Sequence, residues 1–325
     1  MMKLENLICN TEDIAYEILQ SWQHDIDSLR FWRGSSNYVY FFTCNDNEYW
    51  LRFTKKDENS LEEIKAEIQL LLYLNNNGYP CVVPIKSKNN NYVEAIERHK
   101  ETYYAVVFNK AVGVNLDIKN ITKTQLEGWG KALASFHSLS MSFQPKEYVR
   151  KSWKDKLKLT ADILKDFPNE KNALEELYRI KEWLSSLPIT NENYGLIHYD
   201  FELDNIFWNE EFKKFTIIDF DDSMYHWYAM DIAYALRDLY ELEECKKKEG
   251  LQVFLKGYCS VKTIKEEYIE LLPKFKRFGD LITFAKLLRS LKDSDFSQEP
   301  VWLDKLRPKL LNKCQELRDG FIEEW

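Results

Sequence analysis

Several features that would assign this chain to a common functional class are missing from its sequence. Its six cysteines form no CxxC pair, and the chain has no internal repeat, no low-complexity tract and no apolar run of membrane-spanning length. A net charge of −8 and a pI near 5.4 argue against a nucleic-acid-binding surface. The first ten residues lack the apolar segment of a signal peptide. We therefore expect a cytoplasmic protein with reduced thiols and without nucleic-acid or membrane partners.

The composition is nevertheless that of a folded protein with a sizeable core. Of the 325 residues, 45% are hydrophobic and 15% aromatic, and the length fits one large or two medium domains. Strand-like segments dominate up to Asn109, and helical patterning begins soon after it. We place a boundary there, between a β-rich lobe (residues 1–109) and a mainly helical lobe (residues 110–325).

The most informative stretch runs from residue 195 to residue 222. It contains the skeleton His198-x-Asp200-x-x-x-x-Asn205, and Asp219 follows 19 positions after Asp200, at the end of an apolar run. Kinase catalytic loops use this skeleton: the first Asp takes the proton of the acceptor hydroxyl, and the Asn and the later Asp hold Mg²⁺.

A hairpin explains the spacing of this skeleton. Two strand-like runs flank the polar turn 209–214. If Ile206 faces Ile218, Asn205 lies directly opposite Asp219, and directly opposite Cβ atoms are about 5 Å apart, close enough to share one cation. The alternative is a surface hairpin that carries polar ends.

A turn near the N-terminus is a candidate cover for nucleotide phosphates. Gly34, Ser35 and Ser36 lie between two strand-like segments, where backbone N–H groups and two hydroxyls are available. The turn has one glycine instead of a Gly-x-Gly-x-x-Gly motif, so an ordinary hairpin turn remains the alternative.

A buried ion pair is predicted on the next strand and helix. Ser60 and Glu63 form a capping box, and the helix that follows carries Glu67 within its apolar stripe. A carboxylate on a buried face needs a partner, and Arg52 in the preceding strand is the obvious one. In kinases a cation on this strand contacts the phosphates and pairs with a Glu of this helix. The alternative is that Glu67 extends to the helix edge.

Together these segments resemble the aminoglycoside phosphotransferase and choline kinase-like family, which has a protein-kinase-like fold. The resemblance runs in order from Trp32-Arg33-Gly34 to about Leu239, and the segment 195–222 is its most specific part. The helix expected at 122–139 resembles the first helix of the family's large lobe, and Asp219 to Asp231 resembles its metal-binding end. The resemblance implies an α+β fold with a small β-rich lobe and a large helical lobe.

The resemblance also implies roles for individual residues. Asp200 would be the catalytic base, Asn205 and Asp219 the Mg²⁺ ligands, and Arg52 and Glu67 the phosphate-side pair. In addition, His198 would shape the loop and Asp231 would be structural; His137 also fits a packed or capping position better than a catalytic one. Two positions depart from the family pattern, because Tyr199 stands where glycine or arginine is common and Arg52 where lysine is common.

We therefore expect a kinase that uses ATP or GTP with Mg²⁺ and phosphorylates a hydroxyl of a small molecule. A protein Ser/Thr kinase is one alternative, but the chain lacks an Ala-Pro-Glu segment and the room for a long activation loop after Asp219. A non-catalytic nucleotide-binding relative is the other, but Asp200, Asn205 and Asp219 are all present. The sequence leaves the oligomeric state open.

The acceptor is expected to carry an amine, as in an aminoglycoside or an amino alcohol. Four further acids and three rings of the same region could line the mouth of a cleft and hold a cation: Glu202, Asp204, Asp221, Asp222, Tyr225, Trp227 and Tyr228. In the alternative, the acids are solvated and the rings belong to the core. The segment 138–190 and the C-terminal helices are expected to shape the acceptor pocket.

Overall fold

A computed structural model describes residues 11–98, 100–292 and 301–325. The first ten residues, for which no signal peptide was expected, lie outside the described part. The N-terminal lobe comprises α2 (Glu12–Leu19), β1 (Arg30–Gly34), β2 (Tyr38–Cys44), β3 (Asn47–Lys55), α3 (Leu61–Asn76), β4 (Pro84–Ile85), β5 (Glu94–Arg98) and β6 (Glu101–Asn109). Its strands form one antiparallel sheet in the order β1-β2-β3-β6-β4, with β5 also paired to β6.

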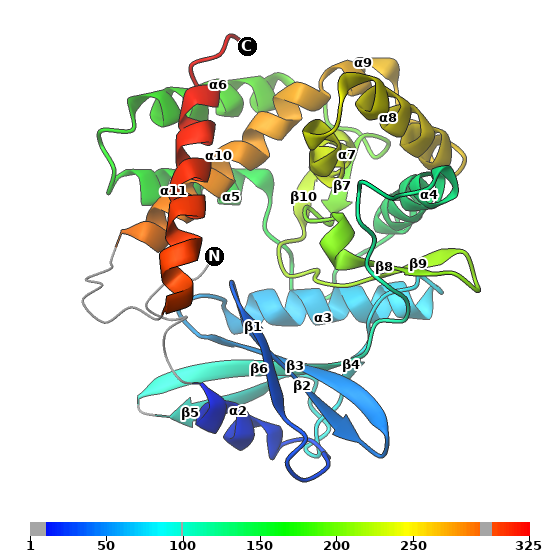
Figure 1. Ribbon diagram of the computed structural model, residues 1–325, viewed down its shortest axis with the longest axis vertical. Helices are drawn as coiled ribbons and strands as arrows, with labels where there is room; N and C mark the ends of the chain where they lie inside the picture. The colour runs from blue at the N-terminus through cyan, green and yellow to red at the C-terminus, as the bar shows by residue number, and fades with distance from the viewer. Residues whose placement is uncertain (1–10, 99, 293–300) are drawn as a thin grey trace.

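The second lobe is mainly helical and contains two short strand pairs. Its elements are α4 (Lys123–Ser140), α5 (Trp153–Leu164), α6 (Lys171–Ser186), β7 (Tyr194–Ile197), η1 (Leu203–Asn205), β8 (Ile206–Asn209), β9 (Lys214–Ile217), β10 (Met224–Trp227), α7 (Tyr228–Ala235), η2 (Leu236–Glu241), α8 (Glu244–Cys259), α9 (Glu266–Glu270), α10 (Leu272–Leu291) and α11 (Val301–Gly320). Figure 1 shows the sheet lobe below, the helical lobe above and α3 between them. The predicted α+β fold class is thus confirmed.

The side chains of β6 point alternately to the two faces of the sheet and belong to two separate hydrophobic cores. Tyr103, Ala105 and Val107 face α2 and the residues around it, whereas Val106 and Phe108 belong to the core that continues through α3 into the helical lobe. Successive side chains of a strand point to opposite faces, so a nearly continuous apolar run is buried on both sides. The sheet is therefore fixed to the large lobe through the face that carries α3.

Local sequence signals place the helices that matter for the site. The predicted capping box of Ser60 and Glu63 is present at the start of α3, and Thr122 and Gln125 form a second capping box at the start of α4. Helices α4 and α8 cross closely, and Gly130 permits this because a Cβ atom at its position would lie 2.0 Å from a backbone oxygen of α8.

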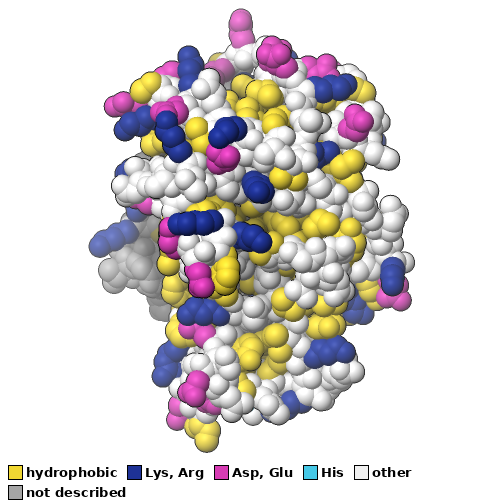
Figure 2. Space-filling model, turned by 90° about the vertical axis from the view of Figure 1, so that its right-hand side faces the viewer, with side chains coloured by type: hydrophobic (Ala, Val, Ile, Leu, Met, Phe, Trp, Pro, Cys, Tyr) yellow, Lys and Arg dark blue, Asp and Glu magenta, His cyan; other side chains and the backbone are white. Residues whose placement is uncertain are grey.

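The connection between the lobes is anchored to the β8–β9 hairpin. The backbone of Val114 exchanges two hydrogen bonds with that of Trp208, at 3.0 and 2.8 Å. This connection runs along the right-hand side of Figure 1, and hydrophobic side chains gather across the middle of that face (Figure 2). Val112 and Val114 of the connection are exposed, at 56% and 61%.

Two further properties follow from the described residues. The five described cysteines are free thiols. Within the described ranges, no helix combines the length and hydrophobicity needed to cross a bilayer.

Buried histidines should make the stability of this fold fall with acid. Burial lowers the pKa of His137, His198 and His226, in the last case to about 3. Below the ordinary histidine pKa of about 6.5, the unfolded chain binds protons that the folded chain cannot, so stability decreases from about pH 6.5 downward. For His226, whose ring is fully buried, the decrease is about 1.4 kcal/mol per pH unit and continues to about pH 3.

In the variant His226→Phe, the free energy of unfolding should therefore fall with acid by about 1.4 kcal/mol less per pH unit than in the parent. Urea-unfolding free energies at pH 6.5, 5.5 and 4.5 measure the slope for the parent and the variant. The slope is the readout because the substitution also removes the 2.8 Å hydrogen bond from the Trp227 N–H and so shifts the absolute stability. Equal slopes would show that His226 binds a proton as readily in the folded state as in the unfolded one.

Candidate active site

The catalytic stretch begins where β7 ends, and His198 joins its two halves. The Nδ1 atom of His198 accepts the Asp200 N–H at 3.3 Å, and its Nε2 atom lies 3.0 Å from the Ile218 carbonyl oxygen. Because a backbone N–H can only donate, Nδ1 is unprotonated and Nε2–H is the donor to Ile218. Burial lowers the pKa of His198, which favours this neutral form. The ring thereby fixes Asp200 relative to the residue preceding Asp219.

Asp231 anchors the same loop from helix α7. Its fully buried carboxylate accepts the N–H groups of His198 and Tyr199, each at 2.8 Å, and lies 2.9 Å from Nε2 of His137. An acid in the first turn of a helix ordinarily accepts N–H groups of that helix, but the donors to Asp231 belong to the catalytic loop. The difference arises because β7 ends against the first turn of α7, a contact that no local pattern reveals.

Asn205 orients the carboxylate of Asp200. The Nδ2 group of Asn205 donates to the carbonyl oxygen of Asp200 at 2.9 Å and to its Oδ2 atom at 3.1 Å. These two hydrogen bonds use only the Nδ2 group of Asn205, and its Oδ1 atom is an oxygen of the kind that hard cations prefer. Asp200 itself is partly exposed, so its other carboxylate oxygen faces the cleft side of the loop.

The hairpin that follows has a different register from the predicted one. Ile206 pairs with Ile217 instead of Ile218, so Asn205 is not directly opposite Asp219. The turn explains the shift, because only four residues connect β8 to β9, and Lys213 among them has a φ of 49°. A register is set by the turn conformation, which the sequence did not specify.

Asp219 is brought to the site by the backbone instead of by strand pairing. The Ile218 N–H donates to the Asn205 carbonyl oxygen at 3.0 Å, which ends the hairpin, and Asp219 then adopts a left-handed φ of 63°. Its Oδ1 atom lies 3.5 Å from Arg52 and its Oδ2 atom 3.3 Å from Arg33. Asp219 and Asn205 thus remain close in the fold. Among the described residues, no group of three or more His, Cys, Asp or Glu could hold a metal ion.

The predicted pair between β3 and α3 is formed. Arg52 donates to Glu67, whose side chain is buried, so the alternative of an extended Glu67 is wrong. Burial opposes the charge of Arg52, but attraction by Glu67, Asp221 and Asp219 raises its pKa above the ordinary value. Arg52 is therefore a permanent cation facing the cleft from the sheet lobe.

The candidate phosphate turn lies at the mouth of the same cleft. Gly34 ends β1, and Ser35 and Ser36 line the large cavity described below. The Ser35 N–H donates to the Asn37 carbonyl oxygen at 3.1 Å, which closes the turn. The structure therefore brings this turn to the side of the cleft that carries Asp219.

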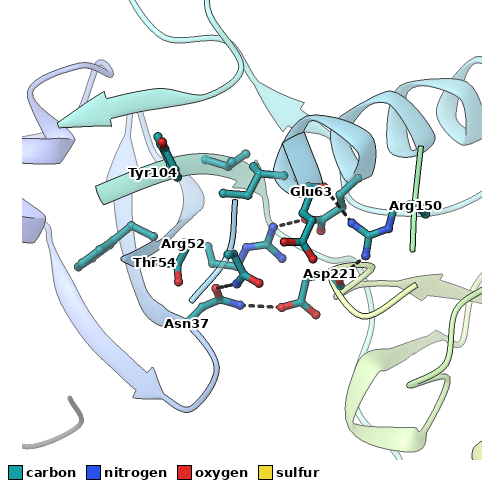
Figure 3. A pocket seen from close by; sticks show the side chains of 12 residues that line it. Asn37, Arg52, Thr54, Glu63, Tyr104, Arg150 and Asp221 are labelled. Atoms are coloured by element: carbon teal, nitrogen blue, oxygen red, sulfur yellow. Dashed lines mark hydrogen bonds and ion pairs between the residues drawn. The ribbon is translucent and has the colours of Figure 1, made fainter. Parts of the chain in front are cut away.

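Two neighbours of this turn were missed by the sequence reasoning. Arg33 contacts Asp219. The Asn37 Nδ2 group donates to Asp221 at 2.7 Å (Figure 3). Asn59 supports Asn37 with a 3.2 Å hydrogen bond to its Oδ1 atom. The only signal in the sequence was that an arginine and an asparagine flank the glycine and serines.

Arg150, also missed, holds the segment after Asp219 from behind. Its guanidinium donates to the carbonyl oxygen of Asp221 and, at 2.9 Å, to that of Glu63 in α3 (Figure 3). It also donates to the carbonyl oxygens of Phe220 and Ser223, the latter at 2.9 Å. Five donors in a rigid fork suit this set of acceptors. Arg150 thus links the segment after Asp219 to the helix that carries Glu67.

A cavity of about 830 Å³ opens in front of Asp200. Helices α10 and α11 contribute part of its wall, as expected of the C-terminal helices, whereas no residue of 138–190 lines it. Its carboxylates are Asp200, Glu202, Asp204, Asp219, Asp221, Asp222, Asp238, Asp280 and Glu316. Six basic side chains accompany these nine acids, so the lining is negative overall.

The expected ring contribution to this cavity is wrong. Trp227 and Tyr228 are buried in the core, Tyr225 lies in the β10–β7 pair, and none of the three lines the cavity. The pairing of β10 with β7 and the immediate start of α7 turn them inward. Other rings line the cavity, namely Tyr199, Tyr234 and Tyr240.

Most charges in the cavity are already paired with each other. Arg237 donates to Glu202, lies 3.4 Å from Asp200 and covers the Tyr234 ring at 4.5 Å. Burial and the nearby Asp200 raise the pKa of Glu202, and Arg237 opposes this shift. An acceptor hydroxyl that reaches Asp200 must therefore enter beside Arg237.

Asp222 is held by two lysines that sequence reasoning did not select. Lys156 of α5 and Lys286 of α10 lie 2.6 and 2.8 Å from its two carboxylate oxygens. Burial opposes its charge, but the two lysines hold the pKa of Asp222 well below the ordinary range. Asp222 therefore connects the segment after Asp219 to α5 and α10 through these two ion pairs.

Comparison with known proteins places these features in context. The profile of a family described as "Phosphotransferase enzyme family" matches residues 28–261. The amicoumacin kinase of Bacillus subtilis (strain 168) is 26% identical to the chain over 296 residues, which covers 86% of the chain and 85% of that protein.

Two solved structures share the fold. An amicoumacin kinase in complex with AMP-PNP, Ca²⁺ and Ami has a TM-score of 0.82 at 21% identity, with 98% of this chain and 96% of that chain covered. A microcompartment-associated aminopropanol kinase has a TM-score of 0.70 at 20% identity, with 93% and 95% covered. These proteins are small-molecule kinases, which does not fit the protein-kinase alternative.

Proposed function

The chain belongs to the phosphotransferase enzyme family, and on that premise we propose that this small-molecule kinase transfers the γ-phosphate of ATP, or of GTP, to a hydroxyl of an amine-bearing acceptor. The observation that carries the proposal is the position of Asp200, whose carboxylate is oriented by Asn205 at the edge of a cavity of about 830 Å³ with a negative lining.

The two lobes divide the work in this proposal. Residues 1–109 form the nucleotide-binding lobe and residues 110–325 the catalytic and acceptor-binding lobe. Arg52, held by Glu67, binds the phosphates, and Gly34, Ser35 and Ser36 cover them. Backbone groups of the connection after β6 bind the base. AMP-PNP in the amicoumacin kinase complex supports a nucleoside triphosphate as the donor.

Asn205 and Asp219 are the proposed Mg²⁺ ligands. Mg²⁺ is commonly bound by one or two side chains together with substrate phosphates and water, and an amide oxygen with a carboxylate fits that set. The carboxylate of Asp219 contacts the cationic groups of Arg33 and Arg52, and a metal cation would be attracted to it in the same way. The bound cation would neutralise charge on the phosphates during transfer.

The chain's own part in the reaction is positioning and proton transfer. The acceptor oxygen attacks the γ-phosphorus, the bond from phosphorus to the bridging oxygen breaks, ADP leaves, and the hydroxyl proton goes to Asp200. Asn205 and His198 hold Asp200, and Asp231 holds the loop backbone. Proximity and orientation account for much of the rate in such a reaction.

An amine on the acceptor suits the charges of the cavity. Its nine carboxylates exceed its six basic groups, and Asp204 is exposed at the rim. The related aminopropanol kinase is named for a molecule that carries both an amine and a hydroxyl. A cationic acceptor would therefore be attracted toward Asp200 before it binds.

We expect ADP release with amine-bearing alcohols and little with neutral sugars. The test compares kanamycin, spectinomycin, 1-amino-2-propanol, homoserine and choline with glucose, at about 0.02 and 0.3 M salt. Since charges more than about 10 Å apart are screened at 0.1 M salt, kcat/KM for a polyamine should fall several-fold at the higher salt. Turnover confined to neutral or anionic acceptors, without salt sensitivity, would reject the cationic acceptor and leave the kinase activity standing.

A further inference from the structure

The hydroxyl of Tyr199 is a buried polar group without a partner in the catalytic loop. Tyr199 is 3% exposed, and its Oη atom forms no hydrogen bond with any described residue. Tyr199 also lines the large cavity, immediately before Asp200 in the chain. Most buried polar groups are hydrogen-bonded in native proteins, so an orphaned hydroxyl at this place calls for a physical explanation.

The chain holds the Tyr199 ring in one position at some cost. Its backbone has a left-handed φ of 74°, which is uncommon for a bulky residue, and its N–H is held by Asp231 at 2.8 Å. The ring stacks on Tyr234 with centroids 4.9 Å apart at 18°, and it meets the Phe278 ring edge-on, with centroids 6.4 Å apart at 89°. The hydroxyl is therefore preorganised, although no residue that the structure describes binds it.

The surroundings of this hydroxyl are those of the acceptor cavity. Burial raises the pKa of Tyr199 well above its ordinary value, and Asp222 and Asp200 raise it further while Arg237 lowers it. These three charged groups also line the cavity. The phenol consequently stays protonated and can both donate and accept a hydrogen bond.

We propose that Tyr199 Oη binds a second polar group of the acceptor, an amine or a hydroxyl, while Asp200 receives the hydroxyl that is phosphorylated. Tyr199 is then a specificity-determining residue for acceptors with two polar substituents, such as amino alcohols and polyols. The inference rests on the proposed function. A bound acceptor supplies the missing hydrogen bond, and an acceptor without the second group leaves the hydroxyl orphaned, which is how hydrogen-bonding sites discriminate strongly.

Tyr199→Phe removes this hydroxyl and keeps the ring stack. With 1-amino-2-propanol, spectinomycin and kanamycin as probes, KM for the acceptor should rise about tenfold, the effect of one hydrogen bond, while kcat and KM for ATP stay unchanged. With 2-propanol, which lacks the amine, variant and parent should have the same kcat/KM.

A matched variant separates binding from folding. Tyr258 is also buried, but its hydroxyl lies 2.8 Å from Nδ1 of His137, outside the cavity. Tyr258→Phe should lower the Tm by about 2–4 °C and leave acceptor KM unchanged. Tyr199→Phe should not lower the Tm, because it removes a group that has no partner.

Each outcome decides the inference. A raised acceptor KM with an unchanged Tm supports it. A Tm lowered as in Tyr258→Phe with an unchanged acceptor KM shows that the hydroxyl serves the fold and overturns the inference, and no change in either quantity overturns it as well. A parent enzyme inactive with every probe defeats the proposed function together with the inference, whereas an active parent with an indistinguishable variant defeats the inference alone.

Discussion

Replacing Asp200 by asparagine should lower turnover by about 10²–10⁴-fold while ATP binding stays nearly unchanged. The substitution preserves the size of the side chain but removes the group that accepts the hydroxyl proton. Since this proton moves in the transition state, the loss should appear in kcat and in kcat/KM, not in the KM for ATP. Steady-state ADP release with an acceptor from the panel above measures both.

The geometry around Asp200 sharpens this test. Asp200 receives hydrogen bonds from Asn205 and approaches Arg237, so an amide at position 200 changes contacts on both sides. A thermal melt therefore accompanies the kinetics, to show that the variant is folded. Asp162→Asn, on the exposed surface of α5, makes the same chemical change away from the cleft and should keep full activity. Parent-like turnover of Asp200→Asn would remove Asp200 from the proton-transfer role.

The parts of the site that could be predicted rest on local or strongly constrained patterns. The capping boxes at Ser60 and Thr122 depend on residues three positions apart, and both are present. Glu67 could be paired with Arg52 from sequence because a carboxylate within an apolar stripe requires a partner, and Arg52 lies within the preceding strand. The change of periodicity near Asn109 predicted a β-rich part followed by a helical part, and the family resemblance implied the α+β fold class.

The missed parts depend on backbone conformation or on contacts between distant segments. The hairpin register was shifted by the turn at Lys213, and Asp219 reaches the site through its own left-handed φ. Arg150 binds four carbonyl oxygens, and no side-chain pattern predicts this because all four acceptors belong to the backbone. The core position of Trp227 was equally hidden, since an aromatic residue after the catalytic segment fits a core and a cleft equally well.

Replacing Asp219 or Asp231 by alanine should also have a large effect, but on different quantities: metal-dependent nucleotide binding for Asp219 and the stability of the apo protein for Asp231. Asp219→Ala should abolish the Mg²⁺-dependent rise in Tm that ATP gives the parent. At a ligand concentration of about 100 times Kd this rise corresponds to about 2.7 kcal/mol. The apo protein should lose only about 1 kcal/mol, from placing alanine at the left-handed φ of position 219, because the carboxylate is partly exposed and its partners, Arg33 and Arg52, lie across the cleft.

Asp231→Ala should instead destabilise the apo protein by about 3–5 kcal/mol. The buried carboxylate accepts two backbone N–H groups of the catalytic loop and contacts His137, and its removal leaves these buried donors unsatisfied. Thermal melts of both variants, without ligand, with ATP and with ATP and Mg²⁺, separate the two roles. If Asp231→Ala erased the Mg²⁺ dependence at an unchanged apo Tm while Asp219→Ala retained it, the cation would have to be assigned to Asp231, and the loop N–H groups would need another acceptor.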